Sequence, residues 1–292
     1  MIHLRRFLVL FAAAAVSCAL PADDVDADDG VAPLVGEPEP IAAPDEGKAD
    51  WLGSSPELWR RFWYYSYYDS LSAPLEAAAS SPPYAGTRTV LLIPGTTIGP
   101  EFFVPMANRL RRDGFDPVIW APPDLFTESL ASGAARIADK VQRVLAARGA
   151  SRLHIVAECD AGVATRHYLQ LLGGDHHVDQ VVTFVSAHHG SRTAPAGSWF
   201  TGWQALKDLQ PDSAFLARLA AAPLPADLHL TSIYTCRDEY LWPYTTSIVA
   251  GATNVEFCGH PLGHFDGFWD RTVYQRILTT LRGQGATAPT RY

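Results

Sequence analysis

Short apolar runs and amphipathic segments take turns along most of this chain. The apolar runs lie at 90–93, 118–120, 153–156, 181–185, 228–234 and 254–257, and each predicts a buried β-strand. Between them, apolar residues recur at helical spacing, most clearly at positions 130, 134, 137, 141 and 144, where the predicted helix closes at Gly149. Further helices are expected up to Arg112 and over 163–172 and 270–281.

This alternation predicts an α/β fold. Consecutive parallel strands need a crossover between them, and helices in that role cover both faces of the sheet. We therefore expect a mostly parallel central sheet with helices on both faces. The chain has 292 residues, 48% of them apolar, and we assign 51–284 to one domain and 285–292 to a short tail. The aromatic-rich start of the domain, 51–68, fits a core-packed helix, a membrane-interface belt or a substrate-facing flap.

The first residues have the layout of an export signal. Basic residues within Met1–Arg6 precede the apolar run Phe7–Val16, and small residues lead to Cys18. The stretch 15–18 resembles a bacterial lipobox, with Ala where Leu is usual. We therefore predict a lipoprotein signal peptide at 1–17 and a lipid anchor at Cys18, with ordinary signal cleavage nearby as the alternative. Either way the protein is expected to be exported, as a membrane-anchored lipoprotein of the periplasm or cell surface or as a secreted protein.

Charge is concentrated in the stretch that follows. The chain has 23 basic and 31 acidic residues, a formal net charge of −8, and ten of the acids but one base fall within 19–50. Residues 18–50 are predicted to be an acidic, disordered tether, because they lack apolar periodicity and their charges repel. Residues 51–292 hold 20 bases and 21 acids, a balance that argues against nucleic acid as a partner.

The turn after the strand at 153–156 has the pattern of a nucleophile elbow. Cys159 stands between two small residues, Ala157 and Ala161, each two positions away. A strained strand-to-helix turn exposes the side chain at its centre, and small flanking residues avoid collision with neighbouring backbone. Cys159 is therefore the predicted nucleophile. Asp160 fits this role less well, because Glu158 would then stand where a small residue is needed.

Five further stretches accompany this turn. They are 92–100 (LIPGTTIGP), 186–191 (SAHHGS), 209–216 (LQPDSAFL), 231–239 (TSIYTCRDE) and Gly263-His264. In this order they resemble the α/β-hydrolase lipases, particularly the bacterial class 2-type and fungal lipase-B-like triacylglycerol lipases, over about 89–281. The resemblance implies an α/β-hydrolase fold and a lipase or esterase that cleaves carboxylic esters of a small molecule or lipid.

The elbow departs from the pattern of that family. These lipases usually read Gly-His-Ser-x-Gly, whereas this chain reads Ala-Glu-Cys-Asp-Ala over 157–161. A Cys nucleophile on this fold is similar to that of dienelactone hydrolases and polyhydroxyalkanoate synthases. Glu158 and Asp160 add negative charge beside the thiol and oppose the pKa-lowering effect of the helix N-terminus and an imidazolium. Two function classes stay open: an active ester hydrolase, or a catalytically impaired lipase-like protein that binds lipid or a partner.

The resemblance also implies the other members of a catalytic triad. Asp238 follows a late strand and would be the acid. His264, in the Gly263-His264 stretch, would be the base, with His260 as the alternative. His264 would take the thiol proton, and Cys159 would attack an ester carbonyl to form an acyl-enzyme.

The oxyanion formed in that attack needs two preorganised donors. By the same resemblance, the donors are the backbone N–H of Asp160 and the backbone of Thr96, with the Thr96 hydroxyl as a further candidate.

Two more pairs of residues suggest specific interactions. Cys236 and Cys258 end consecutive late strands, and export implies an oxidising compartment, so we predict a disulfide that braces the loops of the acid and the base. Two unrelated thiols are the alternative. His188 and His189 are adjacent, and neighbours on one chain rarely chelate a metal alone, so no metal and no cofactor is predicted. A monomer is expected.

Overall fold

The computed structural model describes residues 85–259 and 262–292. Several predictions concern residues outside this range: the signal peptide, the lipidation site Cys18, the acidic tether, the aromatic-rich segment at 51–68 and the alternative base His260. They stay predictions, as do the domain boundaries.

Six parallel strands form one sheet in the order β2-β1-β3-β4-β5-β6. The strands are β1 Thr89–Ile93, β2 Asp116–Ile119, β3 Leu153–Glu158, β4 Val178–Phe184, β5 His229–Tyr234 and β6 Thr253–Glu256. Every predicted strand is present, with ends shifted by up to three residues. In register, Val156 of β3 pairs with Leu92 of β1 and Val182 of β4. The parallel sheet confirms the predicted fold class, and full burial of β1 and β3 explains their continuous apolar runs.

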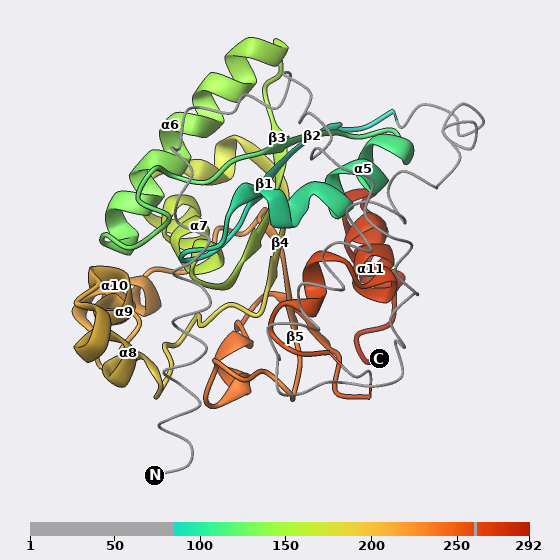
Figure 1. Ribbon diagram of the computed structural model, residues 1–292. Coiled ribbons are helices and arrows are strands. Elements are labelled where there is room, and N and C mark those ends of the chain that lie inside the picture. The colour runs from blue at the N-terminus through green and yellow to red at the C-terminus, as the bar shows by residue number, and fades with distance from the viewer. Residues whose placement is uncertain (1–84, 260–261) are drawn as a thin grey trace, which may run out of the picture.

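Helices cover both faces of this sheet. In Figure 1, α6 and α7 lie on one side of the strands, and α5 and α11 lie on the other. The α-helices are α5 Val104–Arg112, α6 Leu130–Arg148, α7 Cys159–Leu171, α8 Ala194–Thr201, α9 Gln204–Asp208, α10 Ala214–Ala221 and α11 Arg271–Leu281. Short 3-10 helices span η2 Pro100–Phe103, η3 Gly174–His176, η4 Tyr244–Ser247, η5 Asp266–Phe268 and η6 Gly285–Thr287.

The clearest predicted helix is confirmed as α6. Its first turn is capped by the Ser129 hydroxyl, which accepts a hydrogen bond from the N–H of Ser132. It ends where Gly149 adopts a left-handed conformation with φ of 59°. The helices predicted up to Arg112 and over 270–281 are also present, as α5 and α11.

The core lies between the sheet and the two helix layers. On the side of α11, Phe103, Phe184 and Phe268 pack edge to face, with ring centroids 4.9 to 6.0 Å apart. On the other side, Ile137 and Val141 of α6 are fully buried, as their helical spacing predicts.

Helices α8, α9 and α10 are not apparent from the sequence pattern. They are short, they fill the connection between β4 and β5, and α8 contains Gly197, which weakens its helical signal. Figure 1 shows them grouped together, away from α5 and α11. Among the described residues, no helix has both the length and the apolar character needed to cross a bilayer.

The candidate catalytic residues follow the carboxyl ends of the strands. Because the strands are parallel, the segments that leave β1, β3, β5 and β6 emerge at one edge of the sheet. Thr96 follows β1, Cys159 follows β3, Asp238 follows β5, and His264 comes after β6. The topology therefore brings to one edge residues that are far apart in the sequence.

Candidate active site

Cys159 occupies a strained turn between β3 and α7. Its φ is 51°, which is uncommon for a residue with a side chain, and α7 begins at Cys159 rather than at the predicted Val163. The early start was missed because the first helical turn has no apolar periodicity. Gly95 lies against this turn, since a Cβ at Gly95 would stand 2.7 Å from the Cβ of Cys159. The flanking Ala157 and Ala161 are fully buried, which explains why the elbow needs small residues.

The structure brings Asp238 and His264 together beside this cysteine. The Nδ1 of His264 lies 2.8 and 2.9 Å from the two carboxylate oxygens of Asp238, and both side chains are almost fully buried. The N–H groups of Tyr240 and Leu241 donate to Asp238 Oδ1 at 2.9 and 2.8 Å. The carboxylate is thus fixed in place, and the Cys159 thiol hydrogen-bonds to the same imidazole.

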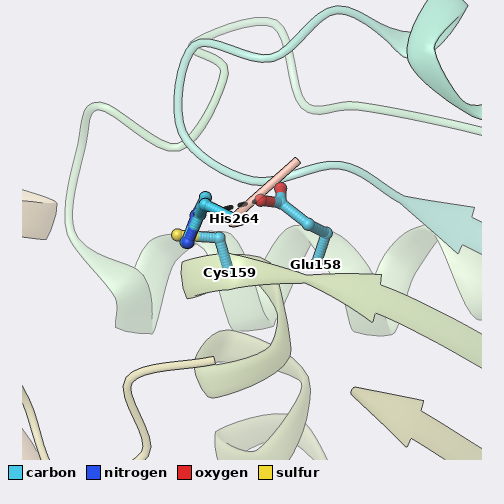
Figure 2. Close-up of side chains that lie close together, drawn as sticks. All are labelled: Glu158, Cys159 and His264. Carbon is cyan, nitrogen blue, oxygen red and sulfur yellow. Dashed lines mark ion pairs between the residues drawn. The ribbon is translucent and has the colours of Figure 1, made fainter. Parts of the chain in front are cut away.

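Glu158 points into the site. Its side chain is fully buried, and its Oε2 accepts a hydrogen bond of 2.7 Å from the N–H of Gly95. Its Oε1 lies 3.3 Å from Nε2 of His264, and Figure 2 shows the Glu158, Cys159 and His264 side chains converging. Glu158 therefore competes with the thiol for the ring nitrogen that would act as the base.

Asp160 occupies the donors expected to bind the oxyanion. Its Oδ1 accepts a 2.7 Å hydrogen bond from the N–H of Thr96, and the Thr96 hydroxyl donates to its Oδ2. Burial and the charge of Glu158 raise the pKa of the Asp160 carboxyl to about 8, against the opposing effect of N–H groups of Thr96, Ala161 and Asp160 itself. Both predicted oxyanion residues are thus in place, but a side chain of the protein fills the position between them.

The charges in the site disfavour the thiolate. Burial raises the pKa of the Cys159 thiol to about 12, and Glu158 and Asp160 add to this effect while His264 opposes it. Burial tends to lower the pKa of His264, but Asp238 and Cys159 outweigh it and hold that pKa well above its ordinary value. The negative charges expected from the sequence to raise the thiol pKa do act in that direction, but the largest cause is burial, which the sequence pattern did not indicate.

An apolar cavity of about 110 Å³ opens onto Cys159. Its wall comes mainly from the loop after β1, from α8 and α9, and from the loops of the acid and the base; Ile98, Leu206, Leu209, Leu241 and Phe265 are among the lining residues. No Lys or Arg of the described chain lines it. The cavity is suited to an acyl chain or another apolar group attached to a reacting carbonyl.

The predicted disulfide between Cys236 and Cys258 is present, with Cα atoms 5.0 Å apart. It ties the segment after β5, which leads to Asp238, to the segment after β6, which leads to His264. A hydrogen bond of 2.9 Å from the Thr235 hydroxyl to the carbonyl of Leu262 joins the same two segments. The acid and the base thus stand on loops that are cross-linked covalently.

Removing this disulfide is expected to lower the stability of the domain. Closing a loop across a sequence separation of 22 residues restricts the unfolded chain, so a Cys236→Ala/Cys258→Ala variant should lose about 3 kcal/mol of unfolding free energy. Urea denaturation followed by tryptophan fluorescence measures the difference. Wild-type protein in reductant should show the same loss, and an unchanged midpoint in both samples would contradict a stabilising bridge.

His188 and His189 face different partners. The Nε2 of His188 lies 3.0 Å from the hydroxyl of Thr183, and the Nε2 of His189 lies 2.9 Å from the carbonyl of Ile248. Both rings thus tie the loop after β4 to neighbouring segments, in line with their interpretation as a structural loop.

Glu239 contributes to the site although the sequence did not single it out. Its Oε2 accepts a hydrogen bond of 2.8 Å from the backbone N–H of His264, and burial is the main cause that raises its pKa to about 7. Its position directly after Asp238 is the only signal in the sequence, because the contact joins two loops that are distant along the chain.

The fold resembles solved structures of bacterial and fungal lipases. A Bacillus licheniformis lipase in its propeptide form matches with a TM-score of 0.56 at 14% identity, covering 69% of this chain and 52% of that one. The mature form of that lipase matches at 0.51 and 16% identity, covering 68% and 91%. Lipase B of Aspergillus fumigatus matches at 0.56 and 17% identity, covering 71% and 56%.

These similarities establish the fold. The chain has the α/β-hydrolase fold predicted from its sequence. It spans about half the length of the propeptide form and of the Aspergillus enzyme. No family model matches the sequence. No curated protein matches it either.

Proposed function

We propose that this protein hydrolyses carboxylic esters, as lipases and carboxylesterases do, through an acyl-enzyme on Cys159. One observation carries the proposal: a cysteine on a strained elbow shares His264 with the buried Asp238, at the mouth of an apolar cavity. A nucleophile, a base and a group that orients the base are the parts that acyl transfer requires.

The reaction would proceed in two balanced steps. In the first, His264 Nε2 accepts the thiol proton while Sγ of Cys159 attacks the carbonyl carbon, and Asp238 holds the imidazolium in place. The carbon–oxygen bond of the ester then breaks, and the imidazolium returns its proton to the departing alkoxide. In the second step, His264 deprotonates a water molecule that attacks the thioester, which releases the carboxylic acid and restores the thiol.

The proposed substrate is an ester of a small molecule or lipid whose acyl group is apolar. This choice is supported by the lining of the cavity, which offers apolar contacts and no cation that would bind an acidic group. We also propose that the protein is exported, is anchored in a membrane by a lipid on Cys18 and is a monomer. The N-terminal sequence supports the export and the lipid anchor.

A second function is favoured by the position of Asp160. Because its carboxyl takes both donors of Thr96, and because Glu158 contacts the nitrogen of the base, the site as it stands stabilises an oxyanion poorly. A protein with this site would hold a lipid or a partner in the cavity without cleaving it.

Trapping the acyl-enzyme tests the proposal. Protein incubated with p-nitrophenyl butyrate and quenched in acid should carry one butyryl group on the peptide that contains Cys159, as shown by mass spectrometry. Cys159→Ala should carry none, and no other peptide of the wild type should be labelled. Ester turnover that persists in Cys159→Ala would contradict this nucleophile. The absence of both adduct and turnover, in the wild type and in Asp160→Ala, would favour the binding protein.

A further inference from the structure

Glu158, Cys159 and His264 present three metal-ligating atoms to one point. Glu158 Oε1, Cys159 Sγ and His264 Nε2 all lie within 4.8 Å of one another, and Figure 2 shows the three side chains converging from the strand end and the facing loop. Carboxylate oxygen, thiolate sulfur and imidazole nitrogen are the ligands that Zn²⁺ takes in proteins. Two ligand atoms on one tetrahedral zinc are about 3.4 Å apart, and the Oε1 to Nε2 distance is 3.3 Å.

Glu158 Oε1 lacks the hydrogen bond that a buried oxygen requires. Among the described residues no donor is hydrogen-bonded to it, although its side chain is fully buried and its other oxygen is bound by Gly95. An unsatisfied buried carboxylate oxygen costs free energy. Its ion-pair partner is Nε2 of His264, 3.3 Å away without a hydrogen bond, and a cation at the point where the three side chains meet would bind this oxygen directly.

The charges around this point favour a divalent cation. Glu158 and Asp238 are two buried acidic residues that contact the same imidazole, that of His264. No Lys or Arg of the described chain lines the cavity, so no basic side chain there balances these acids. Buried charges are stable when they are paired or coordinate a metal.

The ligands are already oriented by a second layer of contacts. Asp238 holds Nδ1 of His264, which directs Nε2 toward the cysteine and fixes the tautomer that ligates a metal. The N–H of Gly95 holds Oε2 of Glu158 and leaves Oε1 facing the histidine. With three protein ligands, the fourth position of a tetrahedral zinc would face the apolar cavity.

We propose that Glu158, Cys159 and His264 bind Zn²⁺. The sequence predicted no metal because its adjacent histidines were the evident candidates, whereas this set combines two adjacent residues with one that only the fold brings near. Zinc binding does not depend on the proposed ester hydrolysis, since a catalytically silent site would bind the ion equally well. In an active enzyme, bound zinc would block the reaction, because it occupies both the nucleophilic sulfur and the nitrogen of the base.

Cobalt spectroscopy and zinc dialysis test this proposal. Tag-free protein, kept without reductant so that the disulfide stays intact, is titrated with Co²⁺; a thiolate-to-cobalt absorption band in the near ultraviolet is expected, which Zn²⁺ then abolishes. Equilibrium dialysis with elemental analysis should find one Zn²⁺ per chain. Cys159→Ala should lose the band, and Glu158→Gln should weaken zinc binding at least tenfold.

Two control variants remove other potential ligands. Glu256 lies near the disulfide cysteines Cys236 and Cys258, in the other described group of potential metal ligands, and Glu256→Gln should bind zinc like the wild type. Cys18→Ser should keep the cobalt band. Circular dichroism confirms that each variant is folded before titration.

The proposal is overturned if wild type and Cys159→Ala bind the same amount of zinc, or if Glu158→Gln binds as tightly as wild type. Ester hydrolysis is measured separately in EDTA, so that failure to bind zinc and failure to hydrolyse esters are distinguishable results.

Discussion

Replacing Asp160 by Ala is expected to raise kcat/KM for p-nitrophenyl butyrate about 100-fold. The carboxyl of Asp160 now accepts hydrogen bonds from both the N–H and the hydroxyl of Thr96. Removing it frees these donors for the oxyanion. One donor in such a site contributes about 10²- to 10³-fold in kcat, and the lower value is appropriate here because Glu158 still contacts His264.

Two variants separate an opened oxyanion site from other effects of the substitution. Asp160→Asn keeps the volume and an oxygen that accepts from Thr96, so its rate should stay within about threefold of wild type. Adding Thr96→Val to Asp160→Ala removes the hydroxyl donor, so kcat/KM of the double variant should be about tenfold lower than that of Asp160→Ala. A rate for Asp160→Ala no higher than that of wild type would contradict the idea that this carboxyl blocks the site.

The strands and the elbow could be predicted because their signals are local. A run such as 90–93 is apolar throughout because β1 is covered on both faces, and small residues beside Cys159 are a steric requirement of the turn itself. Asp238 and the disulfide were predictable for a related reason. They follow strand ends, and the ends of parallel strands meet at one edge of the sheet.

The electrostatic state of the site could not be predicted, because it depends on contacts between distant segments. Whether Glu158 and Asp160 face the thiol or solvent is decided by Gly95 and Thr96, whose N–H groups hold the two carboxyls. Those donors come from the loop after β1, and no spacing within 157–161 encodes their position. The burial that raises the thiol pKa is likewise a property of the assembled fold.

The three buried acids have different effects on the site. Asp238 binds Nδ1 and leaves Nε2 available, whereas Glu158 lies on the Nε2 side, where the thiol and the substrate must also be. Asp160 acts on the oxyanion donors. A site without function would not need Asp238 to be held so closely. The arrangement is better explained by a His264 base that is still used, and whose activity depends on the groups that contact its Nε2 and the Thr96 donors.

Asp238→Asn is therefore expected to lower kcat/KM by about 10³- to 10⁴-fold, because the amide stabilises neither the imidazolium nor the correct tautomer of His264. The measurement is made in the Asp160→Ala background, where the starting rate is highest. Glu239→Gln is the matched control: it changes the adjacent buried carboxyl, but its amide oxygen can still accept from the backbone N–H of His264, so its rate should fall by less than about threefold. Equal losses of kcat/KM in Asp238→Asn and Glu239→Gln would mean that both acids only support the loop. That result would contradict the role of Asp238 in orienting His264.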